Sequence, residues 1–524
     1  MDRTASMNEA LFTYSKDLPD QVTLITPPSV FLLDERIFVS LGILKVGAML
    51  ERAGIFVDHL NLAGIENYIE ALNSYLSNMT SKIIGITATT PQMPAVTQIV
   101  TTIRKVKPGM KIILGGPHVT LTHSAVKLEQ KAGRISRAHE AFQKLKNIAD
   151  VLVSGDGEYA VFQALQTGCS KLVDGDDPNG RFFMTNAAYE NTPYPARHLV
   201  DLSTYCYKIE AQNSTSLIAQ LGCPFECGFC GGRNSKSLRM IRMRSAGSIV
   251  SEVRFLYQTY GYTGFMFYDD ELNVNKGFIE LLDKLACLQK ELKVKFHFRG
   301  FIKAQLFTQE QAQAMYRAGF RWILCGFESG SSRMLENMNK KSTYEDNSRV
   351  VELAKNAGLK VKALMSIGHP GESKETVEQT QKWLLEVQPE EFDCSIITTY
   401  PGTPYYDEAL PHPQLPDVWT YTCKKTNDKL HAYNVDYLQV ADYYKGDPLG
   451  GYQSFVFTDF LKAKEIVQCR DWIEKSVREK LKIPYPKGRS ALRYEHSMGQ
   501  GINLVLPTHI LAQSSTAVRK KEAA

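Results

Sequence analysis

The stretch LGCPFECGFCGG, residues 221–232, decides what kind of protein this chain can form. It brings three cysteines, Cys223, Cys227 and Cys230, together within eight residues. Soft thiolates at this spacing can converge on one iron–sulfur cluster. No fourth cysteine lies nearby, so one iron keeps an open position, which predicts a catalytic site rather than an electron relay. A structural zinc site is disfavoured because it needs four protein ligands, usually from two pairs, and no second pair follows.

The same stretch resembles the cluster loop of the radical S-adenosylmethionine superfamily, in which CxxxCxxC holds a 4Fe–4S cluster. The aromatic Phe229 before the last cysteine is also typical of that loop. The resemblance implies that S-adenosylmethionine chelates the open iron and is cleaved reductively to methionine and a 5′-deoxyadenosyl radical. The protein then binds, orients and excludes water, while the cofactor supplies the chemistry. It also implies a small-molecule substrate and a reductase partner such as flavodoxin or ferredoxin.

Length and composition predict a globular enzyme of several domains. The 524 residues suggest about three domains, and a 44% hydrophobic content provides enough apolar surface for several cores. The net charge of +5 is spread along the chain, so no nucleic-acid partner is expected. Residues 1–20 lack a signal-peptide core, and no stretch approaches ~18 uninterrupted apolar residues. We therefore expect no membrane span and, with ten cysteines and no secretion signal, a cytoplasmic location.

Residues 21–200 alternate short apolar strands with helical patterns. Strands are expected at 22–26, 56–60, 83–87, 111–114 and 150–153. This alternation predicts an α/β domain with a parallel, doubly wound, Rossmann-like sheet. Small residues gather at the carboxyl ends of the strands, where such sheets bind ligands. A nicotinamide or flavin site is disfavoured because no GxGxxG follows the first strand.

This segment resembles the cobalamin-binding domain that precedes many radical S-adenosylmethionine domains. Its glycines would let the backbone approach a large planar ligand, and its threonine hydroxyls would bond the nucleotide tail or propionamides. The residues that the resemblance assigns to cobalamin are Thr87, Thr89, Gly115, Gly116, Gly155, Gly157 and Glu158.

The loop after the first strand departs from a common cobalamin motif. Many cobalamin proteins carry DxHxxG there, and its histidine ligates cobalt, but this loop begins PPSV at residues 27–30. We therefore expect cobalt to lack a histidine ligand. His59 and His118 are interpreted as structural residues.

Residues 201–410 alternate strands and helices again, as a partial (β/α)6 barrel of the TIM type requires. The resemblance assigns S-adenosylmethionine binding to four loops at strand ends. Carboxylates in the first would pair with its ammonium group, and an arginine in the second with its carboxylate. The segment GFESGS, residues 326–331, suits ribose hydroxyls and the amino acid portion, and the loop GHPGE, 368–372, the adenine. The residues so assigned are Asp269, Asp270, Glu271, Arg299, Glu328, Ser329 and Gly368.

The family patterns stop near residue 410. We expect an N-terminal tail at 1–20, the cobalamin-binding domain at 21–200, the barrel at 201–410 and a small α-rich region at 411–524. A charged helix is expected at 462–482. The aromatic residues of this last region would either line a substrate pocket or build a small core.

Three functions remain open at this point. The leading hypothesis is a cobalamin-dependent radical S-adenosylmethionine methyltransferase. It would act on an unactivated carbon of a small metabolite, natural-product or lipid intermediate, through methylcobalamin and the 5′-deoxyadenosyl radical. The second is a cobalamin-dependent cyclisation, oxidation or rearrangement without methyl transfer, as in the anaerobic ring cyclases of chlorophyll synthesis. The third is a cobalamin sensor or carrier. A methylthiotransferase is disfavoured because its extra N-terminal cysteine cluster is absent.

Overall fold

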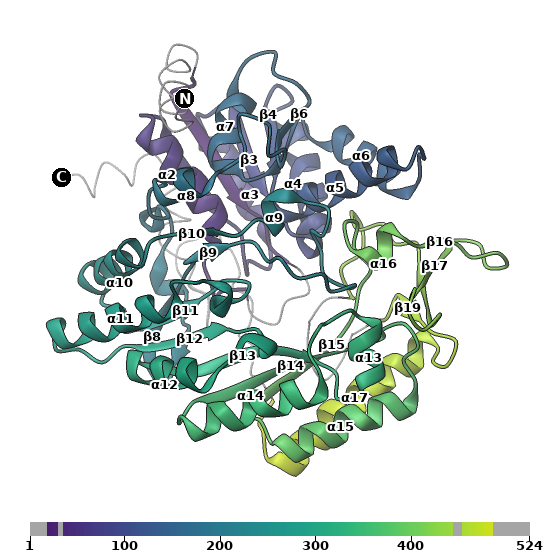
Figure 1. Ribbon diagram of the computed structural model, residues 1–524. Coiled ribbons are helices and arrows are strands. Elements are labelled where there is room, and N and C mark those ends of the chain that lie inside the picture. Colours follow the sequence, from purple (N-terminus) through teal and green to yellow (C-terminus); the bar gives the residue numbers. More distant parts are fainter. Residues whose placement is uncertain (1–17, 30–34, 444–452, 486–524) are drawn as a thin grey trace, which may run out of the picture.

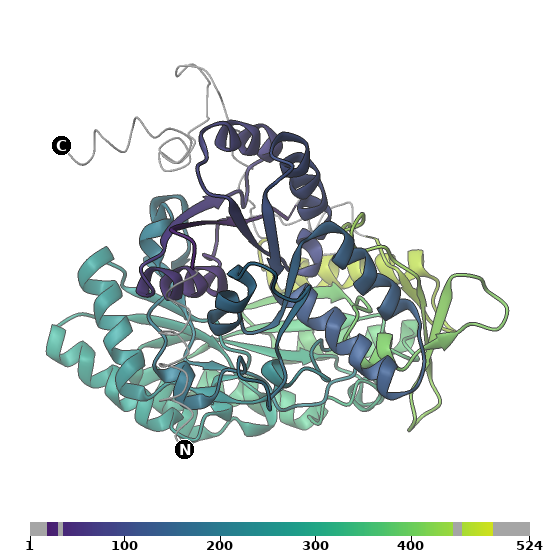
Figure 2. The same cartoon turned by 90° about the horizontal axis from the view of Figure 1, so that it is seen from above.

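Two parallel β-sheets organise the molecule. The computed structural model describes residues 18–29, 35–443 and 453–485. The N-terminal unit, purple and blue in Figure 1, stands over a half-barrel drawn in teal and green. Figure 2 shows from above that the N-terminal unit lies across the half-barrel, with the C-terminal elements beside them.

The N-terminal sheet has six parallel strands in the order β2-β1-β3-β4-β5-β6. Because the order reverses at β1, the switch point of the sheet lies between β1 and β3, where such sheets bind ligands. The strands are β1 (Gln21–Thr26), β2 (Phe56–Asn61), β3 (Ile83–Thr87), β4 (Lys111–Gly115), β5 (Val151–Gly155) and β6 (Leu172–Gly175).

Helices cover both faces of this sheet, which confirms the predicted doubly wound fold. The apolar side chains of α3, α4, α5 and α6 form a core on one face, and those of α2 and α7 form a core on the other. The helices are α2 (Leu41–Arg52), α3 (Tyr68–Asn78), α4 (Met93–Val106), α5 (Pro117–Lys131), α6 (Arg137–Ile148) and α7 (Gly157–Leu165).

The second sheet is the predicted half-barrel. Its strand order is β15-β14-β13-β12-β11-β8-β7, and all neighbours are parallel except the short edge pair β7 and β8. Its strands are β7 (Lys208–Ile209), β8 (Gln212–Leu217), β11 (Gly264–Phe267), β12 (His297–Phe301), β13 (Phe320–Glu328), β14 (Lys360–Ile367) and β15 (Glu391–Ile396). Its outer helices include α10 (Ala246–Tyr260), α11 (Phe278–Leu292), α12 (Gln309–Ala318), α14 (Tyr344–Asn356) and α15 (Lys374–Val387).

A hairpin-like excursion connects β8 to α10 and carries the three cysteines. The short strand β9 (Gln220–Leu221) pairs with β10 (Arg242–Met243) in antiparallel fashion. Between them lie residues 222–235 and the short helix α9 (Lys236–Arg239). The cysteine-bearing residues therefore form a loop whose two ends are held together by β9 and β10.

The C-terminal region completes the barrel. Helix α17 (Ala463–Leu481), yellow beside α15 in Figure 1, matches the predicted charged helix and packs against β15. Glu474 accepts a hydrogen bond from the backbone N–H of Cys394 at 2.8 Å, and Arg478 donates to the carbonyl of Phe392 at 2.8 Å. This helix takes the sixth outer position of the (β/α)6 arrangement.

The same region also contains an antiparallel sheet that its expected α-rich character did not include. Its order is β16-β17-β18-β19, with β16 (Leu410–Pro411), β17 (Val418–Thr422), β18 (Lys429–Tyr433) and β19 (Val456–Phe457). Aromatic and β-branched residues alternate through β17 and favour a strand once a partner is present. Many of the aromatic residues there build this sheet and its packing.

Direct contacts fix the N-terminal unit against the C-terminal sheet. The buried guanidinium of Arg137 on α6 lies 3.6 Å from the ring centre of Tyr406 and 4.2 Å from that of Trp419. Arg134 donates to the carbonyl of Asp407 at 2.6 Å. A cation held between two aromatic rings away from water is a favourable contact, so these residues hold the two units together.

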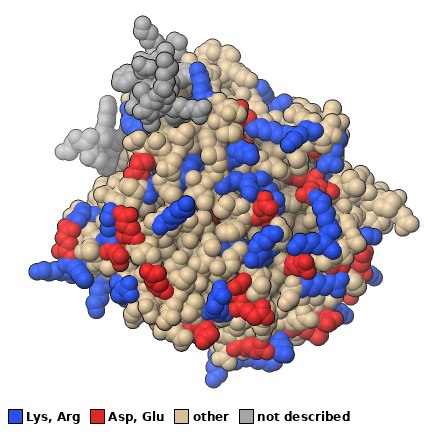
Figure 3. All heavy atoms as spheres, in the orientation of Figure 1, with Lys and Arg blue, Asp and Glu red and all other residues tan. Residues whose placement is uncertain are grey.

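The surface shows no strong separation of charge on the face drawn in Figure 3. Lysine and arginine side chains are interspersed there with aspartate and glutamate. Among the described residues, no helix is both long enough and apolar enough to cross a bilayer.

Candidate functional site

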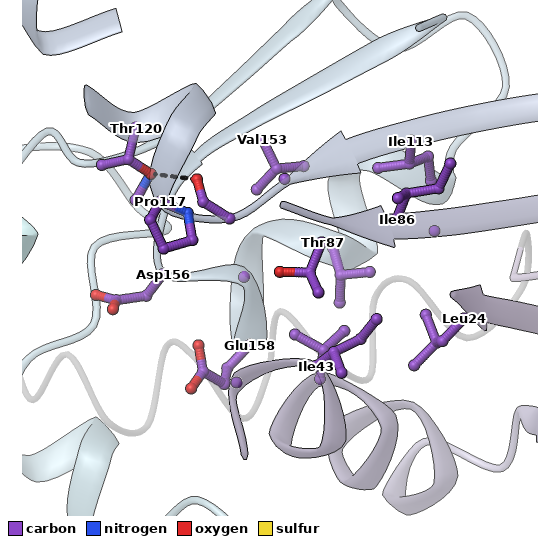
Figure 4. Close-up of a pocket in the computed structure, with 18 of the residues that line it drawn as sticks. Leu24, Ile43, Ile86, Thr87, Ile113, Pro117, Thr120, Val153, Asp156 and Glu158 are labelled. Carbon is purple, nitrogen blue, oxygen red and sulfur yellow. Dashed lines mark hydrogen bonds between the residues drawn. The ribbon is translucent and has the colours of Figure 1, made fainter. Parts of the chain in front are cut away.

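A cavity of about 300 Å³ lies at the carboxyl edge of the N-terminal sheet (Figure 4). We call it the slot. Strand side chains such as Leu24, Ile113 and Val153 form its apolar floor, and Ile43 of α2 lies opposite them. Polar groups stand around its rim. The rim and lining include six of the seven residues predicted to bind cobalamin: Thr87, Gly115, Gly116, Gly155, Gly157 and Glu158.

The seventh predicted residue, Thr89, lies outside the slot. It is exposed, and its hydroxyl donates to Gln92 at 2.9 Å at the start of the 3₁₀ turn η2 (Thr90–Gln92). Ser, Thr and Asn side chains commonly cap the start of helical turns in this way. The position of Thr89 after a strand did not show from the sequence whether it caps a turn or binds a ligand. Its assignment to cobalamin stays a prediction.

Two glycines at the slot let the backbone pass close to neighbouring segments of the sheet. Gly116 has φ +98°, and a Cβ there would lie 2.7 Å from the backbone nitrogen of Ala88. Gly155 has φ +83°, and a Cβ there would lie 2.4 Å from the carbonyl carbon of Gly175. Only glycine accepts both the left-handed conformation and this close approach. The slot therefore presents bare backbone beside an apolar floor, which fits the planar base of a cobalamin nucleotide tail.

Among the described residues, those that line the slot include no histidine. The ring of His59 bonds to the hydroxyl of Thr26 at 2.9 Å, and that of His118 bonds to Thr90 at 3.0 Å. Burial lowers the pKa of His118 to about 4, so this ring is neutral at physiological pH. Both rings have the structural partners expected from the sequence.

The cysteine loop is held at the carboxyl edge of the barrel by its backbone. The N–H of Cys223 donates to the carbonyl of Leu238 at 3.0 Å, and that of Gly228 donates to Met338 at 2.8 Å. The N–H of Gly232 donates to the carbonyl of Gly402 at 3.1 Å. These bonds attach the loop to α9, to the segment after β13 and to the segment after β15, which together surround the barrel mouth.

The three cysteines of the loop differ in their burial. Cys227 is buried, Cys223 is partly buried and Cys230 is exposed. Burial raises the pKa of Cys223 to about 11, and the carboxylates of Glu271 and Asp270 add to the shift. The thiol of Cys223 is therefore protonated at neutral pH without a cluster, and iron binding there would release its proton.

The described residues contain no group of three or more Cys, His, Asp or Glu side chains gathered around a single ion. A cubane cluster binds each thiolate through a different iron, so its ligands lie farther apart than those of one ion. Three thiols on a short loop, with no other protein ligand beside them, fit such a cluster by the chemistry of their donors.

The carboxylate of Asp269 binds backbone N–H groups next to the cysteine loop. Its carboxylate accepts hydrogen bonds from the N–H groups of Ala219, at 3.0 Å, and Gln220. It is 2% exposed, and burial raises its pKa to about 7. It therefore orients the chain between β8 and the cysteine loop. Glu271, whose pKa burial also raises to about 7, faces the cations of Lys340 and Lys303.

Glu328 is the centre of a polar network at the end of β13. The strand is irregular there, and Glu328 has φ +65°, which directs its side chain towards β14. Its carboxylate accepts from Lys340 at 2.8 Å and from the hydroxyl of Ser366 at 2.8 Å. Burial alone would raise the pKa of Glu328, but the charge and hydrogen bond of Lys340 hold it below its usual value. The carboxylate is therefore an anion that the fold keeps in place.

This network reaches the cysteine loop. Ser366 bonds to the ring of His369 at 2.8 Å, and the other ring nitrogen of His369 lies 3.3 Å from the hydroxyl of Tyr405. Phe229, next to Cys230, packs edge-on against His369 with ring centres 5.3 Å apart. The ammonium of Lys340 lies 5.8 Å from the centre of the same phenyl ring. The sequence placed His369 in the loop 368–372 but assigned no individual role to it, to Lys340 or to Tyr405.

Ser329, Arg299 and Gly368 were also predicted to bind S-adenosylmethionine. The first two form hydrogen bonds with other residues of the protein. The hydroxyl of Ser329 bonds to Thr380 of α15 at 2.9 Å and is buried on that side. Arg299 donates to Glu391 at 3.2 Å inside the barrel, near Trp322. Gly368 has φ +90°. The cofactor roles of these residues stay predictions.

Two family models match the chain. The B12 binding domain matches residues 35–146, and the Radical SAM superfamily matches residues 217–384. An uncharacterized methyltransferase of Pyrococcus horikoshii is 26% identical over 340 residues, which cover 63% of this chain and 69% of that protein. The anaerobic magnesium-protoporphyrin IX monomethyl ester cyclase of Cereibacter sphaeroides is 24% identical over 375 residues, which cover 68% of this chain and 58% of that protein.

A solved structure shares the fold of both units. The radical S-adenosylmethionine methyltransferase TsrM from Kitasatospora setae, with cobalamin and a 4Fe–4S cluster bound, superposes with a TM-score of 0.60 at 17% identity. The match covers 78% of this chain and 81% of that one. With the two family models matching in this order along the slot-bearing sheet and the half-barrel, the chain belongs to the radical S-adenosylmethionine enzymes that carry a cobalamin-binding domain.

Proposed function

We propose that this chain is a methyltransferase that adds a methyl group to an unactivated carbon of a small molecule. Its family brings a 4Fe–4S cluster and S-adenosylmethionine to the half-barrel and cobalamin to the N-terminal unit. When bound, these groups supply a carbon radical and a methyl carrier. The radical would remove a hydrogen atom from the substrate carbon, which would then take the methyl group from the carrier, so the two cofactor sites must open towards one substrate.

One observation carries the proposal. The slot is lined by Leu221, Ser237 and Leu238, which flank the cysteine loop on its two sides. The wall of one cofactor site is thus built from the chain that holds the other. Cofactors placed at these two sites would face a common space, as transfer of a group between them demands.

The charged residues of the barrel mouth would bind and orient S-adenosylmethionine. Glu328, kept anionic by Lys340, is a fixed acceptor for ribose hydroxyls or an ammonium group. Asp270, which is exposed beside the cysteine loop, offers a second carboxylate. Asp269 would act indirectly, because it holds the backbone of Ala219 and Gln220, from which the cysteine loop departs.

The N-terminal slot would hold cobalamin by its nucleotide tail. The apolar floor removes the base from water, and Gly116 and Gly155 allow the tail to lie against the backbone. Thr87 at the rim supplies a hydroxyl. The described lining residues offer no imidazole, so this part of the chain would leave cobalt without a histidine ligand.

The test is to give anaerobically reconstituted protein S-adenosylmethionine labelled in its methyl group, together with candidate substrates. Mass spectrometry should find the label in the product, with 5′-deoxyadenosine and S-adenosylhomocysteine both formed. A reductase such as flavodoxin or ferredoxin would supply the electrons in a cytoplasmic setting. Deoxyadenosine release with an unlabelled product would contradict methyl transfer.

Radical cyclisation is the second candidate. The cyclase of Cereibacter sphaeroides matches this chain over a longer segment than the Pyrococcus methyltransferase does. The same labelling experiment separates the two, because a cyclase forms a product of unchanged carbon count. A sensor or carrier would release no deoxyadenosine at all.

A further inference from the structure

The return arm of the cysteine loop, residues 233–243, is fastened to the N-terminal unit. The buried carboxylate of Asp176, just after β6, accepts hydrogen bonds from the hydroxyl of Ser235 at 2.6 Å and from the N–H of Ser237 at 2.8 Å. Arg242 forms an ion pair with Asp156 at the rim of the slot. The arm belongs by sequence to the radical domain, but its side chains are anchored on the cobalamin-binding sheet.

Leu238 of this arm touches both sites. Its side chain lines the slot. The same side chain packs so closely on Gly232 that a Cβ there would lie 2.6 Å from its Cδ1, and Gly232 has φ +81°. Its carbonyl accepts the N–H of Cys223 at 3.0 Å. Leu238 therefore supports the first residue of the CxxxCxxC motif and the stretch just after the last one, while it closes the slot.

We propose that Leu238 is a positioning residue shared by the two cofactor sites. A ligand in the slot restrains the Leu238 side chain from one side, and the ordered cysteine loop restrains it from the other. Filling the slot then stabilises the loop, and assembly of the cluster tightens the slot by the same factor, because binding linkage is reciprocal. The inference rests on the proposed function only in that both cofactors bind, and it does not require methyl transfer.

The first test uses the full-length, cluster-free protein with hydroxocobalamin as the probe. Hydrogen exchange of peptides covering residues 222–240 should slow several-fold when cobalamin is added, since the Cys223 amide is held by Leu238. Leu238→Ala should weaken cobalamin binding about tenfold, as expected when a few methyl and methylene groups lose their contact with the ligand, and should abolish the protection of the loop. Leu238→Met should keep both.

Leu306→Ala is the matched control. Leu306 in the 3₁₀ turn η6 (Ala304–Leu306) has the same exposed fraction as Leu238, 37%, and does not line the slot. It should leave cobalamin affinity and loop protection unchanged. Circular dichroism and thermal melting check that each variant folds.

Gly232→Ala tests the same link from the cluster side. Gly232 does not line the slot, but an added Cβ would displace Leu238. We expect cobalamin affinity to fall in this variant too. Wild-type affinity in both Leu238→Ala and Gly232→Ala, or loop protection that survives in Leu238→Ala, would overturn the proposal. A folded protein that shows the linkage but transfers no methyl group would refute the proposed function alone, whereas failure of the wild type to bind cobalamin would refute both.

Discussion

The slot of the N-terminal sheet and the cysteine loop of the half-barrel are prepared for their ligands in different ways. The slot is built from packed strands and helices and is open at about 300 Å³ without any ligand. The cysteine loop is held by backbone hydrogen bonds, and its thiols are not gathered around a single ion. Core packing can shape a cavity in advance, whereas cysteine ligands lose their protons and complete their site only when the metal binds.

The two regions also differ in charge. The slot floor is apolar, and the barrel mouth holds the buried ion pair of Glu328 and Lys340. A preformed apolar slot suits a large neutral group, and a fixed anion suits the ribose and ammonium groups of S-adenosylmethionine. Substitutions should therefore act on one region and spare the other, except through the shared residue Leu238.

The largest effect is expected from the cysteines. Replacing Cys223, Cys227 or Cys230 by Ala should remove the 4Fe–4S cluster, because two remaining thiolates do not hold a stable cubane. Iron and sulfide analysis after anaerobic reconstitution measures this, and cobalamin binding should persist. The exposed Cys206 and Cys287 serve as controls, since their replacement should leave the cluster in place. Iron near the wild-type level in all three loop variants would refute the cluster assignment.

Distorting the rim of the slot should remove cobalamin and spare the barrel. Gly116→Leu introduces a side chain where a Cβ already approaches the backbone nitrogen of Ala88 to 2.7 Å. Bound cobalamin should be lost, while reductive release of 5′-deoxyadenosine continues. Gly42→Ala is the control, because Gly42 also lines the slot but a Cβ there meets no atom within 4 Å. Retained cobalamin in Gly116→Leu would show that the ligand lies elsewhere.

Neutralising Glu328 should reduce deoxyadenosine release and leave cobalamin bound, the opposite of the result expected for Gly116→Leu. Glu328→Gln removes the ionic partner of Lys340 and the proposed acceptor for S-adenosylmethionine. A lost charge-assisted hydrogen bond costs about 1.5–3 kcal/mol, so deoxyadenosine release should fall roughly ten- to a hundred-fold, with cobalamin still bound. Glu336→Gln, at an exposed carboxylate, provides the comparison. If Glu328→Gln and Gly116→Leu each lose both deoxyadenosine release and bound cobalamin while folded, the account of two sites is wrong. A single composite pocket would then hold both cofactors.

A smaller effect is expected on the pH dependence of the free energy of unfolding, through Glu372 at the barrel edge. Glu372 is 1% exposed, and burial raises its pKa to about 7. Between its unfolded pKa and about 7, the folded state alone keeps this proton, so the free energy of unfolding falls as pH rises through that window and is constant above it. Glu372→Gln should remove up to about 3 kcal/mol of this fall. Urea denaturation at pH 5 and pH 8 measures it, and an unchanged slope would contradict the protonated state.

The sequence predicted both sheets and most of the slot because strand ends and glycines are local signals. Gly116 and Gly155 were assigned because the loops that follow two apolar strands resemble those of cobalamin-binding domains. The pairing of Glu328 with Lys340 depends on the path of the chain between β13 and α14, which no periodicity specifies. A strand-end carboxylate such as Asp269 can face a ligand or a neighbouring backbone, and only the fold shows that it holds Ala219 and Gln220.

The packing position of α17 could not be predicted from the sequence, for a similar reason. Its helical pattern is clear, but a pattern does not name the sheet against which a helix packs. The contacts of Glu474 and Arg478 with β15 place it on the half-barrel. In the same way, β17 becomes a strand because β18 pairs with it.

Electron paramagnetic resonance of the reconstituted protein tests most directly whether one chain holds both cofactors at separate sites. The reduced sample should show a 4Fe–4S signal that S-adenosylmethionine perturbs. The cob(II) form should show cobalt without the hyperfine triplet of an axial nitrogen, because the slot residues that the structure describes include no imidazole. The absence of either signal from folded, reconstituted protein would contradict the account, as would a nitrogen triplet that disappears in His118→Ala or His59→Ala.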